Sequence, residues 1–259
     1  MSHAPRKRFG QNFLRDEGII EAIARAIAPD KAQHLVEIGP GEGAITQSLI
    51  ASGCRFDAIE LDRDLRTRLL ASFSTYDNFT LHSADALKFD FASLQQGEQA
   101  LRVIGNLPYN ISTPLLFKLL DYGALIADMH FMLQLEVVER LAAEPGNKNW
   151  GRLGVMAQFQ CEVEQLFEVP PESFFPPPKV QSAVIRLTPR QTPRWAEVDR
   201  ESLAKMVSQA FSQRRKTLRN NFKNSLTDAQ FETAGIDPQA RAETLTIDHF
   251  VALASISRS

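Results

Sequence analysis

Through the first half of the chain, short apolar segments alternate with segments whose apolar residues recur every three or four positions. The apolar segments predict strands and the others predict helices. Such an alternation is typical of a doubly wound, mostly parallel α/β sheet. The predicted strands are 34–38, 55–61, 79–82, 101–105 and 129–135, and the predicted helices are 16–28, 44–51, 64–73, 112–120 and a segment ending near Ala143.

The pattern changes in the second half. Residues 162–169 and 181–187 predict two strands, and a hairpin of this kind would close the edge of the parallel sheet. Residues 188–195 contain two prolines and predict a linker, after which apolar residues recur only at helical spacing. We therefore predict an α/β domain at residues 1–193 and a small all-α domain at residues 194–259.

Composition excludes several classes of protein. A hydrophobic fraction of 44% over 259 residues supports a sizeable core and excludes disorder for the bulk of the chain. No stretch approaches the roughly 18 uninterrupted apolar residues of a membrane span, and the basic N-terminus lacks the apolar core of a secretory signal. Cys54 and Cys161 are too few for a disulfide framework. These features predict a cytoplasmic protein with no membrane partner.

Three glycines, Gly39, Gly41 and Gly43, stand at alternate positions between a predicted strand and a predicted helix. Glycine there lets the backbone approach a ligand closely. Glu60 ends the next predicted strand, where a carboxylate can accept hydrogen bonds from both hydroxyls of a ribose. Asp85 follows the third strand and could accept a hydrogen bond from an adenine amino group. These residues fit NAD and an adenosine-based cofactor almost equally, because the turn lacks the last glycine of the dinucleotide fingerprint.

The segment Asn106-Leu107-Pro108-Tyr109 follows the fourth predicted strand. It therefore belongs at the carboxyl edge of the sheet, where ligands bind in open α/β folds. An amide oxygen, a backbone carbonyl held by proline and an aromatic ring are grouped there. Such a set can accept both hydrogens of an exocyclic amine while the ring stacks on a base. No metal is expected.

The charge distribution indicates a nucleic-acid partner, although a net charge of −2 and a pI near 6.2 argue weakly against one. Two basic clusters contain no acidic residue, one at the N-terminus and one in the all-α part. Arg215 and Arg219 are four residues apart, so we expect them to share one face of a helix that has no acidic partners. The expected RNA-binding residues are Arg6, Lys7, Arg8, Arg214, Arg215, Lys216 and Arg219.

Seven blocks of sequence, in this order, resemble the ribosomal RNA adenine dimethyltransferase family. They span nearly the whole predicted α/β domain, whereas the C-terminal part resembles the family's helical domain only loosely. The resemblance implies a Rossmann-like methyltransferase fold: a mostly parallel, doubly wound sheet with an antiparallel edge hairpin, plus a small helical RNA-binding domain. The blocks are residues 8–14, 37–43, 60–62, 85–87, 106–112, 151–153 and 174–180.

The same resemblance implies the reaction. The cofactor is S-adenosylmethionine, and two methyl groups go to N6 of each of two adjacent adenosines. These adenosines lie in the 3′-terminal hairpin loop of 16S rRNA, so the partner is the small ribosomal subunit or its precursor and the role is in subunit biogenesis. We expect the protein to act as a monomer.

The resemblance also assigns roles to residues around the cofactor. Asn12 and Leu14 flank its methionine part, Gly39 lies under it, Glu60 holds the ribose and Asp85 holds the adenine. The implied cofactor residues are Asn12, Leu14, Gly39, Gly41, Glu60, Asp85 and Asn106.

Other residues are expected to act on the target adenosine. The side chain of Asn106 and the carbonyl of Leu107 would accept hydrogen bonds from N6–H, and Pro108 would hold that carbonyl. The target adenine, once it has left its base stack in the RNA, would lie between the rings of Tyr109 and Phe174.

Three alternatives remain open at this point. An NAD-dependent oxidoreductase explains the glycines and Glu60 but leaves residues 106–109 and the basic clusters unexplained. A non-catalytic RNA-binding assembly factor that keeps a cofactor pocket could have an identical sequence. A large-subunit rRNA methyltransferase that confers macrolide resistance is related, but the blocks 106–110 and 174–180 favour the small-subunit enzyme.

Overall fold

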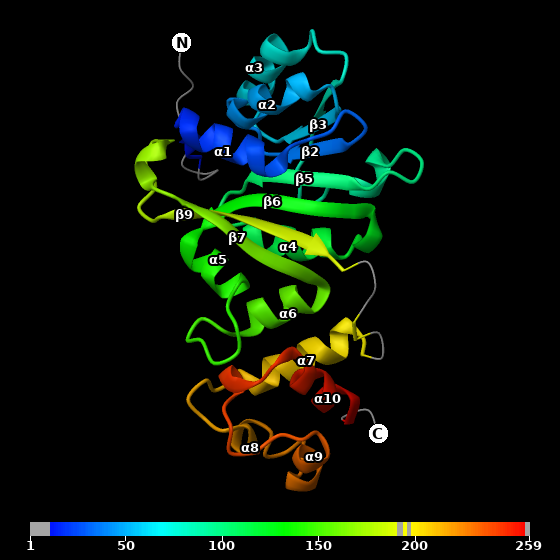
Figure 1. Cartoon of the computed structure of the whole chain (residues 1–259), viewed down its shortest axis with the longest axis vertical. Helices are drawn as coiled ribbons and strands as arrows, with labels where there is room; N and C mark the ends of the chain where they lie inside the picture. The colour runs from blue at the N-terminus through cyan, green and yellow to red at the C-terminus, as the bar shows by residue number, and fades with distance from the viewer. Residues whose placement is uncertain (1–10, 191–193, 196–197, 257–259) are drawn as a thin grey trace. The chain divides into compact units, whose positions relative to one another are not determined.

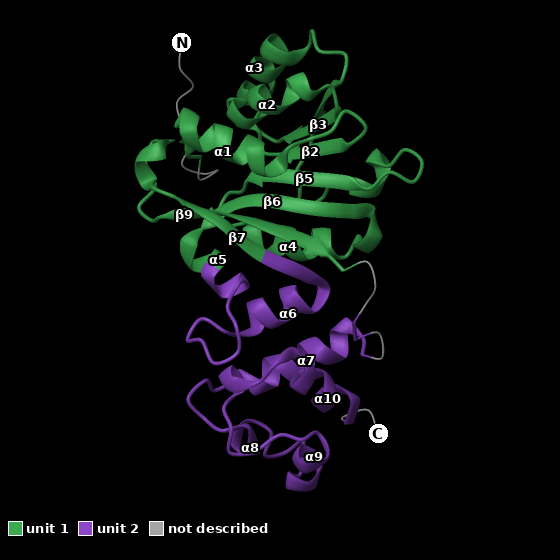
Figure 2. Ribbon diagram, in the orientation of Figure 1, with its two compact units in different colours: residues 1–138, 164–191 green, residues 139–163, 192–259 purple. Residues whose placement is uncertain are grey.

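The computed structural model describes residues 11–190, 194–195 and 198–256. The chain forms two compact units, coloured separately in Figure 2. Unit 1 comprises residues 1–138 and 164–191, and unit 2 comprises residues 139–163 and 192–259.

The central sheet has seven strands in the order β4-β3-β2-β5-β6-β9-β7 (Figure 1). Neighbours from β4 to β6 are parallel, whereas β9 runs antiparallel to β6. The predicted doubly wound sheet with an antiparallel edge is therefore confirmed. The strand order reverses between β2 and β5, which is the position where open α/β sheets bind ligands. The strands are β2 (His34–Ile38), β3 (Arg55–Glu60), β4 (Phe79–Ser83), β5 (Leu101–Asn106), β6 (Ile126–Gln134), β7 (Cys161–Val169) and β9 (Ser182–Pro189).

Helices follow the strands as the periodicity predicted. Asp16 caps α1, its carboxylate accepting a hydrogen bond from the backbone N–H of Ile19 at 3.1 Å. Ile23 and Ile27 of the same helix are buried in the core formed with α2 and the sheet. In Figure 1, α1 crosses in front of the sheet and α4 lies behind it. The helices are α1 (Glu17–Ile27), α2 (Ala44–Leu49), α3 (Arg63–Phe73), α4 (Ser112–Leu120) and α5 (Leu135–Leu141).

Two short strands that the periodicity did not predict join distant parts of unit 1. β1 (Phe13–Leu14) pairs antiparallel with β8 (Phe174–Phe175), with Phe13 opposite Phe175 and Leu14 opposite Phe174. The backbone N–H of Arg15 extends this pairing by donating to the carbonyl of Ser173 at 2.8 Å. The pairing fixes the segment that follows residue 10 against the proline-rich loop before β9.

Among the described residues, the regular elements of unit 2 are helices, apart from the first residues of β7. Trp150 is fully buried in it, and its indole N–H donates to the carbonyl of Leu245 at 2.9 Å. The sequence-based domains, 1–193 and 194–259, followed chain order. In the structure, residues 139–163 pack with the C-terminal helices, through contacts between residues far apart in sequence. The helices are α6 (Arg152–Gln160), α7 (Arg200–Ala210), α8 (Leu218–Asn221), α9 (Asp228–Thr233) and α10 (Ile247–Ile256).

The basic segment between α7 and α8 corrects one prediction. Helix α7 ends at Ala210 and α8 begins at Leu218, so Arg215 and Arg219 do not share a helix face. The N–H groups of Leu218 and Arg219 donate instead to the carbonyls of Ala240 and Pro238, each at 2.9 Å. A continuous helix would need those N–H groups for intrahelical bonds, and these long-range partners prevent it.

Candidate active site

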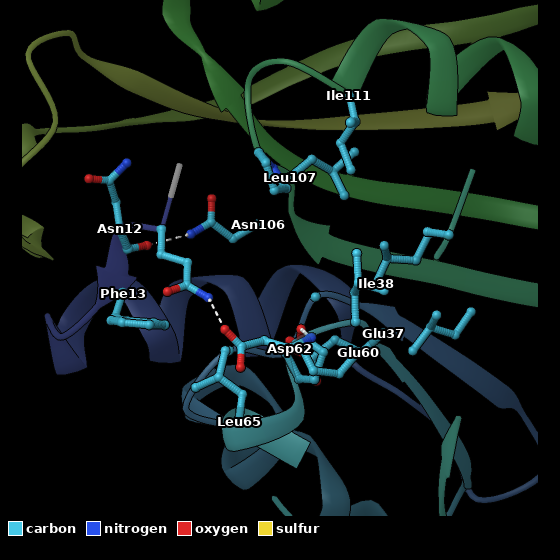
Figure 3. Close-up of a pocket in the computed structure, with 18 of the residues that line it drawn as sticks. Asn12, Phe13, Glu37, Ile38, Glu60, Asp62, Leu65, Asn106, Leu107 and Ile111 are labelled. Atoms are coloured by element: carbon cyan, nitrogen blue, oxygen red, sulfur yellow. Dashed lines mark hydrogen bonds between the residues drawn. The ribbon is translucent and has the colours of Figure 1, made fainter. Parts of the chain in front are cut away.

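A cavity of about 280 Å³ lies at the carboxyl ends of β2, β3 and β5 in unit 1 (Figure 3). The segment 11–14 and Phe174 close it from the other side. Every cofactor and reaction residue predicted from the sequence lines this cavity: Asn12, Leu14, Gly39, Gly41, Glu60, Asp85, Asn106, Leu107, Pro108, Tyr109 and Phe174.

The glycine-rich turn allows a close approach of backbone to the cavity. Gly39, Gly41 and Gly43 all have positive φ, at 65°, 61° and 85°. A Cβ on Gly43 would lie 2.6 Å from Cε2 of Phe73, and one on Gly41 would lie 3.2 Å from Cδ1 of Phe13. The positive φ favours glycine at both positions, and at Gly43 the ring of Phe73 also leaves too little space for a Cβ.

Glu60 lies at the end of β3 and is 7% exposed. Its Oε1 accepts a hydrogen bond from the backbone N–H of Asp62 at 2.8 Å. Burial raises the pKa of the Glu60 carboxyl, while the backbone N–H groups of Asp62 and Gly41 oppose that rise. The carboxylate is thus held in a fixed orientation at the rim of the cavity, where it can accept further hydrogen bonds (Figure 3).

Glu37 is a cavity residue that the sequence analysis did not select. It is the penultimate residue of β2, is 1% exposed, and accepts a hydrogen bond from the hydroxyl of Thr46 at 2.5 Å. Burial raises the pKa of Glu37 to about 7, with a smaller contribution from the charge of Glu60. Its position two residues before Gly39, near the end of a predicted strand, was the signal that could have identified it.

Asp85 follows β4 and organises a tight turn. Its Oδ1 accepts a hydrogen bond from the N–H of Leu87 at 3.0 Å, and its carbonyl accepts from the N–H groups of Lys88 and Phe89, each at 2.9 Å. The carboxylate is at once a turn residue and part of the cavity wall.

Asn106 ends β5 and faces the N-terminal segment. Its side-chain nitrogen donates to the carbonyl of Asn12 at 3.2 Å (Figure 3), so the amide oxygen is the atom that can accept from a ligand. Gly105 precedes it in close contact with β2, since a Cβ there would lie 2.5 Å from the carbonyl oxygen of Ile38. The N–H of Leu107 donates to the carbonyl of Met132 at 3.2 Å, which anchors the loop to β6.

Phe174 reaches the cavity through the pairing of β8 with β1. It is 5% exposed, whereas Phe175, on the opposite face of the strand, is 55% exposed.

The sequence analysis did not predict a role for the residue before Asn12. Gln11 donates to Oδ2 of Asp62 at 3.3 Å and so ties the N-terminal segment to the start of α3 (Figure 3).

The predicted basic cluster of unit 2 is exposed, but the prediction that it lacks acidic partners is wrong. Arg219 donates to Oδ1 of Asp228 at 3.0 Å, and Arg214 lies 3.6 Å from Glu243. Arg215 and Lys216 are exposed. Arg6, Lys7 and Arg8 lie outside the described residues.

Two features are absent from the described part of the chain. No group of three or more His, Cys, Asp and Glu residues there could hold a metal ion. No helix there has the length and apolar character that crossing a membrane requires.

Comparisons with known proteins match nearly the whole chain. The family model described as ribosomal RNA adenine dimethylase matches residues 2–258. The chain is 58% identical to the ribosomal RNA small subunit methyltransferase A of Saccharophagus degradans, over 98% of this chain and 94% of that protein. It is 55% identical to the protein of the same name from Pseudomonas aeruginosa, with the same two coverages.

Two solved structures are also similar. A dimethyladenosine transferase from Plasmodium falciparum has a TM-score of 0.80 at 25% identity and covers 93% of this chain and 95% of its own. The 23S rRNA methyltransferase ErmE has a TM-score of 0.75 at 25% identity and covers 96% of this chain and 100% of its own.

Proposed function

The chain belongs to the ribosomal RNA adenine dimethylase family, and on this premise we propose that it dimethylates N6 of two adjacent adenosines in the 3′-terminal hairpin loop of 16S rRNA. It is an enzyme that methylates adenine in small-subunit rRNA with S-adenosylmethionine as methyl donor. The substrate is the small subunit or its precursor, and the protein acts as a cytoplasmic monomer.

The residues of the cavity fit the cofactor. Glu60 would hold the ribose hydroxyls and Asp85 the adenine amino group, because buried or oriented carboxylates are strong acceptors for these donors. Asn12 and Leu14 would flank the methionine part, and the positive-φ turn at Gly39 and Gly41 leaves room beneath it. Bound S-adenosylmethionine supplies an electrophilic methyl group on a sulfonium.

The loop after β5 would prepare the nucleophile. The N6 lone pair of adenine is delocalised into the ring, which makes it a poor nucleophile. Hydrogen bonds from N6–H to the amide oxygen of Asn106 and the carbonyl of Leu107 would pull the nitrogen toward sp³ geometry and stabilise the charge that develops on it. Tyr109 and Phe174 would hold the two faces of the base in line for transfer. The proton of the product ammonium can leave to water, so no strong base is needed.

One observation carries this proposal: Glu60, Asp85 and Asn106 come from three different strand ends and line a single cavity. An NAD-dependent oxidoreductase would not account for the family membership together with residues 106–109. A non-catalytic assembly factor could have both, and the methyl-transfer assay below distinguishes it from an enzyme. A large-subunit methyltransferase is disfavoured, because ErmE is 25% identical whereas the small-subunit relatives reach 58%. We further propose that the exposed cations of unit 2 bind rRNA phosphates.

The test is methyl transfer to isolated small subunits that lack the modification, followed by mapping of the methylated nucleotides. Dimethylation of two adjacent adenosines is expected for the natural chain. Asn106→Ala should lower the single-turnover rate on the order of a hundredfold while subunit binding is retained. Methylation elsewhere, or a near-normal rate in the variant, would contradict the proposal.

A further inference from the structure

The turn that contains Asp85 presents three carbonyl groups to α4. Within the turn, the carbonyl of Asp85 already accepts from Lys88 and Phe89. The carbonyls of Ala86, Leu87 and Phe89 instead accept hydrogen bonds from the ammonium group of Lys118. Partly buried carbonyls need such partners, because an unsatisfied one costs free energy.

Lys118 satisfies all three. Its ammonium nitrogen lies 3.2 Å from the carbonyl oxygen of Ala86, 3.0 Å from that of Leu87 and 2.5 Å from that of Phe89. An ammonium has three N–H donors and no acceptor, so its number of donors matches these three carbonyls. The ring of Phe91 lies under the same group at 5.5 Å.

Two carboxylates lie near the partly buried ammonium of Lys118. Burial lowers the pKa of the ammonium, and the carboxylates of Asp85 and Asp90 oppose that shift. Tyr122, which follows α4, makes a second contact with the segment after this turn. Its hydroxyl accepts a hydrogen bond from the N–H of Phe91 at 3.2 Å and lies 3.3 Å from Oδ1 of Asp90.

Helix α4 follows the loop 106–111, which lines the cavity. It begins at Ser112, whose N–H donates to the carbonyl of Pro108 at 3.2 Å and whose hydroxyl donates to the carbonyl of Tyr109 at 3.2 Å. Lys118 lies six residues later on the same helix and therefore connects the loop that would hold the target base with the turn that holds Asp85.

We propose that Lys118 is a positioning residue that holds the 85–89 turn so that the Asp85 carboxylate selects the amino group of the cofactor's adenine. This inference rests on the proposed function, in which Asp85 faces the adenine. Lys118 does not touch the cofactor; it acts through the turn. Removing its donors frees three carbonyls, the turn relaxes, and the carboxylate loses its orientation.

The experiment compares the affinities of two ligands by calorimetry. S-adenosylhomocysteine carries the 6-amino group, and S-inosylhomocysteine has an oxygen in its place. Lys118→Met keeps the length of the stem but has no donor. We expect it to bind S-adenosylhomocysteine about tenfold more weakly and S-inosylhomocysteine less than twofold more weakly, so that the preference for the amino group falls. Lys88→Met removes an exposed cation from the same turn and is expected to leave both affinities unchanged.

Equal losses for both ligands, or no loss for either, would overturn the positioning role. Lys118→Gln keeps two N–H donors and carries the test if the methionine variant does not fold; it should show a smaller loss of preference. Asp85→Asn tests the underlying placement separately, because its amide can donate to the hypoxanthine oxygen and should shift preference toward S-inosylhomocysteine. If Asp85→Asn leaves the preference unchanged, the adenine assignment fails whatever Lys118 does.

Discussion

Replacing Glu37 with glutamine should remove a measurable part of the pH dependence of the protein's stability. The carboxyl group is buried at the end of β2, and its partner is the hydroxyl of Thr46. In the folded protein its pKa is raised from 4.5 to about 7, chiefly by burial. Glutamine has nearly the same shape and cannot ionise.

The sign follows from proton linkage. Between pH 4.5 and about 7 the unfolded chain has already released the proton of Glu37, whereas the folded protein still holds it. The unfolded state therefore binds fewer protons, and the free energy of unfolding falls as pH rises through this window. One pKa unit corresponds to about 1.36 kcal/mol, so the full shift is worth about 3 kcal/mol. Between pH 5 and pH 8.5 the expected loss in the free energy of unfolding is about 2–3 kcal/mol.

The assay is urea unfolding at pH 5 and pH 8.5 for the natural chain and Glu37→Gln. The other titrating groups are present in both proteins, so the difference between their two pH-dependent changes reports Glu37 together with its coupling to Glu60. That difference should be about 2–3 kcal/mol, with the variant losing less stability at high pH. Any cost of burying the glutamine amide is the same at both pH values, so it cancels from this comparison.

Glu98→Gln provides the matched control, since Glu98 is exposed in a loop of unit 1. It should leave the pH dependence unchanged. If Glu37→Gln follows the natural chain at both pH values within 0.5 kcal/mol or so, the carboxyl does not hold its proton in the folded state and the reasoning from burial is wrong.

Three further predictions concern the site and the RNA contact. Glu60→Ala should weaken S-adenosylmethionine binding by about 1.5–3 kcal/mol, because a charged acceptor is lost; unchanged affinity in calorimetry would refute the ribose assignment. Gly105→Ala should destabilise the protein by about 1–3 kcal/mol, because the added Cβ meets the carbonyl of Ile38. Urea unfolding measures this loss, and a variant as stable as the natural chain would show that β2 and β5 can separate freely. Arg214→Glu combined with Arg215→Glu should weaken small-subunit binding and flatten its salt dependence while cofactor affinity is kept. A salt slope equal to that of the natural chain would mean that the RNA contact lies elsewhere.

The sequence was sufficient for features that depend on neighbouring residues. The periodicity of apolar residues predicted the strands β2 to β6 and most helices of unit 1, with ends within a few residues of those observed. In a parallel sheet the carboxyl ends of the strands lie at one edge. The positions of Glu60, Asp85 and Asn106 at or just after the ends of their strands therefore predicted that they would lie close together. Local pattern and this one topological rule were therefore enough to predict that these three polar residues line one cavity.

Tertiary structure decided what depends on contacts between distant residues. β1 and β8 are two residues long and carry no periodic signal, yet their pairing brings Phe174 to the cavity. In unit 2, the N–H groups of Leu218 and Arg219 find carbonyl partners at Ala240 and Pro238, and this interrupts the helix that local spacing predicted. Arg219 likewise gains Asp228 as a partner from another helix. A hydrogen bond or ion pair between residues far apart along the chain exists only after the chain has folded, so local spacing cannot reveal it.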